Sequence, residues 1–393
     1  MIAAADLAAR LEELVPIGRG PLGTTRLAWS EEDAATGDWF RAQAEATGLG
    51  AERDPAGNLW AMPDAPPPWW ALGSHLDSVR QGGSFDGALG VAAAFEVAAR
   101  AAGGPGAAPV AVISFADEEG ARFNTPTFGS RALTGVLDAS VLDRVDGDGV
   151  RMRDAMSAAG VSPAGIQAAP DWLDRLRGFL ELHIDQTTEL ERAGAPAGVV
   201  RGLVSRVRVR AEIEGRADHS GTTPPAERRD ALAAAARLIV TALDASGDGL
   251  VATASRIEVE PNALTTVPAR ARVWLDARSP DPARVEAWRE TVAAADVGLP
   301  VRLSLESRSP RCEFDPRLRS RLAELSREMG RPAPELDCWA GHDAGLIAAR
   351  LPAAMVFVRN ETGVSHSPHE HVELDDAAFG ADLLLRLVRE LAA

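Results

Sequence analysis

The sequence predicts an α/β fold in which a catalytic domain, with a central mixed sheet flanked by helices, is interrupted by a smaller α+β domain. In the first half, short apolar runs alternate with Ala-rich helical segments, as in sheets whose strands are joined by crossover helices. Near Ser205 apolar residues begin to alternate with charged ones, which indicates strands with one face in water. The first pattern returns near Pro316. We therefore expect a discontinuous catalytic domain at 1–205 and 317–393, and an inserted domain at 206–316.

The catalytic domain is expected to contain buried strands that end beside polar residues, and helices that cover the sheet. The predicted strands are Trp70–His75, Val110–Ala116, Phe179–Ile184 and Ala353–Val358. The predicted helices are Met1–Gly20, Leu89–Ala102, Pro316–Glu328 and Asp375–Leu391. Because ligands of open α/β sheets usually bind at the carboxyl ends of the strands, the polar residues there are the candidates for a site.

The inserted domain is expected to be a compact sheet with helices on one face. Val207, Val209, Ala211 and Ile213 alternate with charged residues and predict its first strand. The elements that follow are a helix at Arg228–Leu243, strands at Arg256–Glu260 and Ala269–Ala277, a helix at Arg284–Ala294 and a strand at Val301–Leu305. Two helices and four strands in this order are typical of an α+β unit.

Composition limits the class of partner. The chain has 393 residues and a net charge of −16, which argues against nucleic acid because phosphate binding needs clustered Lys and Arg. No run approaches the roughly 18 uncharged apolar residues of a membrane span. Met1–Gly20 lacks the basic start and the continuous apolar core of a signal peptide, and the chain contains only two Cys. We expect a cytoplasmic protein that binds neither membrane nor nucleic acid.

Two of the seven His lie at the ends of apolar strands, and a third follows another strand in a loop. His75 is followed two residues later by Asp77, a carboxylate suited to orient the second ring nitrogen of a metal-bound imidazole. His183 ends the predicted strand Phe179–Ile184, and His366 lies in a Ser-rich loop. Taken singly, each His is more often structural than a ligand. Asp86, in a Gly-rich loop, is by itself better read as a turn residue.

The run Asp117-Glu118-Glu119 ends another buried strand. Three adjacent carboxylates repel one another unless a cation is present, although a solvated acidic turn is an equal alternative for the run alone. In the functional interpretation Glu119 binds metal and Glu118 takes a proton from the attacking water. Nitrogen and oxygen ligands without thiolate suit two divalent ions, with Zn²⁺ favoured and Mn²⁺, Co²⁺ or Ni²⁺ as alternatives.

These segments resemble the aminoacylase/carboxypeptidase-type metallohydrolases, in particular the branch of N-carbamoyl-L-amino acid hydrolases and allantoate amidohydrolases. The resemblance runs from Thr25-Arg26 and Asp54-x-x-Gly57-Asn58 to the C-terminal helix, and is densest at Glu118–Phe123 and Gly129-Ser130-Arg131. It implies a zinc-peptidase-like catalytic domain. It also implies two ligand sets that share Asp86, listed as His75, Asp86 and His183 for one metal and Asp86, Glu119 and His366 for the other.

The resemblance also implies roles for residues outside the ligand sets. Gly215–Pro224 is similar to a substrate-lid motif, in which His219 stabilises the oxyanion in the active site of the neighbouring subunit. The inserted domain would then be a lid and dimerisation domain of a homodimer. Arg278 matches the arginine that binds the substrate carboxylate, Gln186 matches a substrate-contacting glutamine, and His342 lies in a loop beside the pocket. Three of these residues also have an alternative structural role. His219 would cap a helix from its loop, Arg278 would end an exposed strand, and His342 would pack behind the site.

Several positions depart from the pattern of that branch. They are Asp185, Thr187 and Thr188 around Gln186, Thr265 where an Asn is expected, Cys338-Trp339 in place of a small pair, and Arg359-Asn360 before the His366 loop. Trp339 would occupy much of a pocket, and loss of an Asn amide removes a directional contact. Arg359 would add a second anion contact or face solvent. We expect retained chemistry on a shifted substrate.

The sequence thus predicts a metal-dependent hydrolase of carbon–nitrogen bonds in linear amides. The favoured substrate is an N-carbamoyl-L-amino acid or a related N-acyl compound that carries a carboxylate. Allantoate or ureidoglycolate is the alternative with the same chemistry. A non-catalytic binder of small molecules is the third hypothesis, and the intact Glu118 and ligand set count against it.

Overall fold

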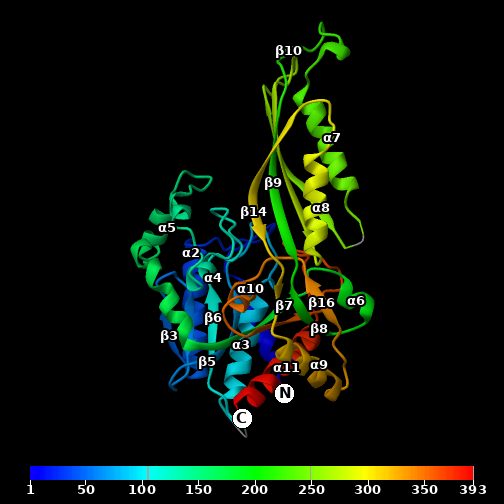
Figure 1. Cartoon of the computed structure of the whole chain (residues 1–393). Helices are drawn as coiled ribbons and strands as arrows, with labels where there is room; N and C mark the ends of the chain where they lie inside the picture. The colour runs from blue at the N-terminus through cyan, green and yellow to red at the C-terminus, as the bar shows by residue number, and fades with distance from the viewer. Residues whose placement is uncertain (104–105, 248, 393) are drawn as a thin grey trace. The chain divides into compact units, whose positions relative to one another are not determined.

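The computed structural model describes residues 1–103, 106–247 and 249–392 (Figure 1). The chain forms two compact units. Unit 1 comprises Met1–Arg201, Glu313–Leu336 and Gly341–Ala393, and unit 2 comprises Gly202–Cys312 and Asp337–Ala340. No helix in the described part of the chain is both long and apolar enough to cross a membrane.

Unit 1 is built on a mixed sheet, as predicted. Along the sheet the strands are β15 (Cys312–Glu313), β8 (Ala197–Leu203), β17 (Ala353–Val358), β7 (Leu176–Ile184), β5 (Trp69–His75), β6 (Val110–Phe115), β4 (Leu59–Met62) and β3 (Gly50–Arg53), with β16 (Glu335–Cys338) paired to β8. The central strands β17, β7, β5 and β6 are parallel. They are buried along nearly their whole length, which explains their continuous apolar sequences.

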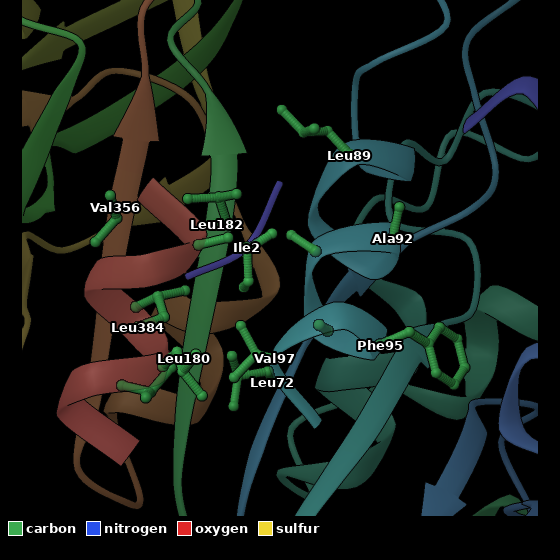
Figure 2. Packing of buried hydrophobic residues seen from close by; sticks show 14 of the residues in the cluster. Ile2, Leu72, Leu89, Ala92, Phe95, Val97, Leu180, Leu182, Val356 and Leu384 are labelled. Atoms are coloured by element: carbon green, nitrogen blue, oxygen red, sulfur yellow. The ribbon is translucent and has the colours of Figure 1, made fainter. Parts of the chain in front are cut away.

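The main core lies between this sheet and a group of helices. These helices are α1 (Ala4–Leu14), α2 (Glu31–Thr47), α3 (Ala88–Ala101), α9 (Pro316–Glu328) and α11 (Leu374–Ala392). Figure 2 shows Leu72, Leu180 and Leu182 of the strands packed towards α3 and α11, and all three are buried. A second buried cluster gathers residues of α4 (Phe128–Leu133), η1 (Ala139–Asp143), α5 (Met152–Ala158) and η2 (Pro163–Arg175).

The predicted first helix, Met1–Gly20, is too long. α1 ends at Leu14, and Arg19–Gly20 (β1) pairs with Gly23–Thr24 (β2). Pro16 has no amide hydrogen to continue the helix. Gly18 has φ 71, and a Cβ there would overlap the carbonyl of Thr25. The amphipathic pattern of the leucines marked the helix but not its end.

Unit 2 is the predicted α+β unit with a four-stranded antiparallel sheet. The strand order is β11 (Val251–Glu260), β13 (Arg270–Ser279), β9 (Ser205–Glu214) and β14 (Val301–Ser309). The helices α7 (Ala231–Asp244) and α8 (Pro282–Ala293) pack on the sheet and bury alternate residues such as Val207 and Val209. The other residues of β9 therefore lie on the face opposite the helices. β11 begins at Val251, earlier than the predicted start at Arg256. The sequence pattern missed the segment Val251–Ser255 because its mostly small side chains give a weak strand signal.

Short elements complete the two units. In unit 2, β10 (Asp218–His219) pairs with β12 (Thr266–Val267), and η3 spans Pro225–Glu227. In unit 1, α6 spans Glu189–Ala193 and α10 spans Asp343–Ala348.

Candidate metal centre

The carboxyl ends of the parallel strands meet at one edge of the unit 1 sheet, and the predicted metal ligands lie there. β5 ends at His75, β7 carries His183 next to its end, and Glu119 follows β6. His366 lies in the loop after β17, and Asp86 lies in the loop before α3. Parallel pairing of these strands brings together segments that are distant in sequence.

Asp86 lies at the centre of the cluster, with its two carboxylate oxygens directed to different groups. Its Oδ1 lies 3.4 Å from His75 Nε2 and 3.1 Å from His183 Nε2. Its Oδ2 lies 3.5 Å from His366 Nε2, which is 3.4 Å from Glu119 Oε1. In each of the two groups the ligand atoms lie within 4.8 Å of one another. The structure thus brings all five residues together in the two sets that the resemblance implies.

The ring orientations of His75 and His183 suit metal ligation. Nδ1 of His75 lies 3.0 Å from the carbonyl oxygen of Asp77, and Nδ1 of His183 lies 3.0 Å from that of Ile184. A carbonyl only accepts, so each Nδ1 donates and each Nε2 is turned towards Asp86 Oδ1. Nε2 of His183 is buried, with the carboxylate oxygen Asp86 Oδ1 only 3.1 Å away. Such an atom fits a bound cation.

Asp77 lies beside His75, as expected, and also holds the turn that follows β6. Its carboxylate lies 3.6 Å from His75 Nδ1, whereas its main-chain oxygen makes the hydrogen bond to that nitrogen. The carboxylate instead accepts the backbone N–H groups of Glu118 at 3.1 Å and Glu119 at 3.0 Å. Asp77 therefore positions the turn that carries both glutamates and orients His75 through its backbone.

The electrostatics of the cluster also fit a cation. Burial, followed by repulsion from Asp86, raises the pKa of Glu119 to about 8. Burial raises the pKa of Glu118 well above its ordinary value. Burial acts on Asp86 in the same direction, but His183 and His75 outweigh it and hold the pKa of Asp86 well below its ordinary value. Buried carboxylates that resist ionisation when no cation is present are expected where divalent ions bind.

Three further side chains hold Asp86 and its loop. Gln186 Nε2 donates to Asp86 Oδ2 at 3.1 Å and to Ser365 Oγ at 3.2 Å, so its amide faces the Asp86 carboxylate. Ser365 Oγ lies 3.0 Å from Asp86 Oδ2 and 3.2 Å from Glu370 Oε1. Glu370 Oε2 accepts the N–H groups of Phe85 at 2.9 Å and Asp86 at 3.0 Å. Sequence reasoning missed Ser365 and Glu370, whose closeness to His366 was the only available signal.

His342 lies directly behind the ligand set. Its side chain is buried, and neither ring nitrogen has a hydrogen-bond partner among the described residues. The ring meets that of His183 edge to face, with the centroids 4.3 Å apart, and Glu181, His183 and His342 form a third group of possible ligands. Burial, and then the charge of His183, lowers the pKa of His342 well below its ordinary value. A neutral imidazole here can contact a substrate atom or an ion.

Unit 2 carries the other predicted site residues. His219 is exposed on β10, and its Nδ1 accepts the backbone N–H groups of Gly221 at 3.1 Å and Thr222 at 3.2 Å. The neutral ring therefore carries its hydrogen on Nε2, which is left as a donor. The exposed Thr265 lies next to this turn, and its carbonyl oxygen accepts from Ser220 N at 2.9 Å.

Arg278 lies next to the end of β13 on the same unit. Its Nε donates to Asp276 Oδ1 at 2.9 Å, and its Nη1 donates to the carbonyl oxygen of Trp339 at 2.5 Å. The Trp339 side chain is half-buried.

Several departures from the family pattern have local structural roles. Arg359 Nε lies 2.8 Å from Asp376 Oδ2, and its Nη1 lies 3.2 Å from Glu191 Oε2, so it pairs with α11 and α6 rather than with the ligand cluster. Asn360 Oδ1 accepts the N–H groups of Thr362 and Gly363, at 3.2 Å each, at the start of the His366 loop.

The same holds for the three changed residues beside Gln186. Asp185 Oδ1 accepts from the backbone and hydroxyl of Thr187, at 2.9 and 2.8 Å. A methyl group of Thr188 lies against Gly363, where it would meet any added Cβ.

Comparison with known proteins agrees with this geometry. Residues 71–390 match the family described as Peptidase family M20/M25/M40. An N-carbamoyl-L-amino acid amidohydrolase of Geobacillus stearothermophilus is 36% identical over 100% of this chain and 99% of its own. An allantoate amidohydrolase of Escherichia coli (strain K12) is 30% identical over 97% of each chain. The crystal structure of an amidase of the hydantoinase/carbamoylase family from Burkholderia multivorans has a TM-score of 0.84, at 30% identity, covering 100% of this chain and 98% of the other.

Fold and ligand cluster together define a metal-dependent hydrolase. The chain belongs to the peptidase M20/M25/M40 family, and its similarity is to the amidohydrolases of that family. The predicted reaction class, hydrolysis of non-peptide carbon–nitrogen bonds in linear amides, is thereby confirmed.

Proposed function

We propose that the protein hydrolyses an N-carbamoyl-L-amino acid, or a related N-acyl compound, at a site that holds two divalent ions. The observation that carries this proposal is Asp86, whose Oδ1 faces His75 and His183 while its Oδ2 faces His366. A carboxylate that faces two separate histidine groups is suited to bridge two ions. In this proposal His75, Asp86 and His183 hold one ion, and Asp86, Glu119 and His366 hold the other. Zn²⁺ is favoured, with Mn²⁺, Co²⁺ or Ni²⁺ as alternatives.

The bound ions supply the acidity of the attacking water and the polarisation of the scissile carbonyl. Glu118 is the base of the reaction. Its Oε2 lies 3.9 Å from His75 Nε2, and its backbone is fixed by Asp77, so the carboxylate is held beside the ligands without belonging to either set. Glu118 takes the proton from the water and returns it to the leaving nitrogen. With a ureido substrate the products are an amine and carbamate, which decays to ammonia and carbon dioxide.

Residues of unit 2 bind the substrate and stabilise the oxyanion. The Nε2–H of His219 is directed outwards, because Nδ1 is occupied by two backbone donors, and it stabilises the negative oxygen of the tetrahedral intermediate. Arg278 binds the substrate carboxylate. Thr265 and Trp339, and His342 of unit 1, are further substrate-binding residues in this proposal.

We propose that His219 acts in the site of a second copy of the chain, in a homodimer formed through unit 2. β11 is an edge strand of the unit 2 sheet, and α7 packs against it. Exposed apolar residues gather on these two elements, including Val251 and Ile257 of β11 and Val240 and Leu243 of α7. An unpaired strand edge beside exposed aliphatic residues is suited to pairing between chains. We expect this homodimer to work in the cytoplasm.

Allantoate or ureidoglycolate is the second candidate substrate, because relatives of this chain include allantoate amidohydrolases. The deciding experiment measures ammonia release by metal-loaded protein from a panel of N-carbamoyl-L-amino acids, allantoate and ureidoglycolate. Glu118→Gln serves as the control, since it keeps the shape of the side chain and removes the base. We expect release from the carbamoyl compounds and none from the variant. Release from allantoate alone selects the second candidate, and tight binding without turnover by the wild type indicates a non-catalytic binder.

A further inference from the structure

Three arginines lie together on the face of the unit 2 sheet that the helices leave uncovered. Val207 and Val209 are buried in the helix-covered core, so Arg206 and Arg208 lie on the opposite face of β9. In the register of the sheet, Arg278 of β13 lies directly opposite Arg206. Residues directly opposite in antiparallel strands have Cβ atoms about 4.5–5.5 Å apart, so the guanidinium groups share one small area. We call these three residues the arginine cluster.

One carboxylate balances this cluster. Asp276 Oδ1 accepts from Arg278 Nε at 2.9 Å, and its Oδ2 accepts from Arg208 Nε at 3.2 Å and Nη2 at 3.1 Å. Arg206 donates from Nη2 to Ser309 Oγ at 3.3 Å, while its Nε is buried and has no partner among the described residues. Among the described residues, three positive charges therefore face one negative charge, in a chain whose net charge is −16.

The excess of positive charge is confined to this cluster. Other arginines of the same sheet have acidic partners of their own. Arg210 lies 3.3 Å from Glu306, Arg272 lies 3.1 Å from Glu258, and Arg302 lies 3.2 Å from Glu212. Like charges directly opposite in a sheet destabilise it. Burial is the main cause that lowers the pKa of Arg206; the carboxylate of Asp276 opposes this shift, and the charges of Arg208 and Arg278 add to it. An anion bound at the cluster would relieve the imbalance.

We propose that Arg206 and Arg208 extend the carboxylate subsite of Arg278, so that the cluster takes a substrate with two carboxylates. The substrate class is an N-carbamoyl or N-acyl derivative of an acidic amino acid. Arg278 and Arg206 lie opposite one another on the same face of the sheet, close enough for two neighbouring carboxylates of one ligand. Asp276 fixes Arg278 and Arg208, which limits the entropy lost when the anion binds. This inference rests on the proposed function in taking Arg278 as the arginine that binds the substrate carboxylate.

Binding calorimetry on metal-loaded Glu118→Gln protein tests the inference without turnover. The ligands are N-carbamoyl-L-aspartate and N-carbamoyl-L-alanine, which share the ureido group and one carboxylate and differ in the second carboxylate. We expect the dianion to bind at least about tenfold more tightly, as one additional charged hydrogen-bonded pair provides. Adding Arg206→Gln should remove about that factor for the dianion and change the affinity for the monoanion less than about threefold.

Arg210→Gln on the same strand is the matched control, because Arg210 is paired with Glu306, and it should change neither affinity. Melting curves of each variant establish that it is folded. Equal binding of the two ligands, or an equal loss for both in Arg206→Gln, would overturn the proposal. If the protein binds the dianion selectively but hydrolyses none of the carbamoyl compounds, allantoate or ureidoglycolate, the carboxylate subsite is supported and the proposed function is wrong. Failure of the subsite proposal and failure of the proposed function are therefore distinguishable.

Discussion

The hydrogen bonds of Glu370 predict that this residue controls metal affinity without being a ligand. Its Oε2 accepts the N–H groups of Phe85 and Asp86, which fixes the backbone of Asp86. Its Oε1 meets Ser365 Oγ, which also contacts Asp86 Oδ2. Glu370→Ala removes all of these bonds at once and leaves two backbone donors without an acceptor in a mostly buried place.

The magnitude follows from the bonds that are lost. Hydrogen bonds to a charged group contribute about 1.5–3 kcal/mol each, and part of the loss is recovered when the loop relaxes towards water. Residues that orient metal ligands typically change affinity by about 10–100-fold when they are removed. We therefore expect Glu370→Ala to weaken metal binding by that factor. Glu370→Gln should stay within about threefold of the wild type, because the amide oxygen can accept both N–H groups while the amide nitrogen donates to Ser365 Oγ.

Competition with a chromophoric chelator measures these affinities directly. Glu373→Ala is the matched control, because Glu373 lies at the end of the same loop, is exposed, and contacts His371 rather than Asp86. If Glu370→Ala bound metal as tightly as Glu373→Ala, the loop carrying Asp86 would be held by other contacts and the reasoning would be wrong. A second check is Gly83→Ala, since a Cβ at residue 83 would overlap Glu370. It should weaken metal binding in the same direction.

Three other predictions follow from contacts in the structure. Arg359→Gln should change KM less than about threefold, because Arg359 is paired with Asp376 and Glu191. The loss of these pairs should lower the free energy of unfolding in urea by about 1 kcal/mol. A tenfold rise in KM would instead show that Arg359 contacts the substrate. Asp54→Asn should cost about 2 kcal/mol of stability, because Asp54 accepts four hydrogen bonds, and an unchanged urea midpoint would contradict this. Mixing inactive Glu118→Gln with inactive His219→Asn chains should restore partial activity if His219 acts in a partner's site, and no recovery in an exchanging mixture would exclude that.

Three of the candidate ligands could be predicted from their positions relative to apolar strands, and the division into two sets came from the family resemblance. His75, His183 and Glu119 lie at or just beyond the ends of apolar strands, and parallel pairing places such ends at one edge. Asp86 alone reads as a turn residue, and only its membership in the set distinguishes it. Glu370 could not be found in this way, because its bond to the Asp86 backbone joins residues 284 positions apart and depends on two loops meeting.

Differences from a family pattern show where a chain has changed but not where the side chain points. Arg359 and Asn360 stand at positions expected to shape the pocket, yet one pairs with Asp376 and the other caps its own loop. Conversely, the sequence pattern does not distinguish Arg206 and Arg208, because alternating arginines are ordinary on the solvent-exposed face of a strand. Only the register with β13, which places Arg206 opposite Arg278, reveals the unbalanced charge.

The two halves of the ligand cluster are preorganised to different degrees. His75 and His183 are almost fully buried, and each is oriented by a backbone carbonyl, so their nitrogens face Asp86 Oδ1 before any ion is present. His366 has half of its side chain exposed and φ 55, and it lies in a loop held chiefly by Ser365 and Asn360. Ordering a side chain when an ion binds costs conformational entropy, so ligands that are already fixed bind more tightly. The set with His75 should therefore bind its ion more tightly than the set with His366. Glu370, which holds the shared Asp86 loop, then influences both.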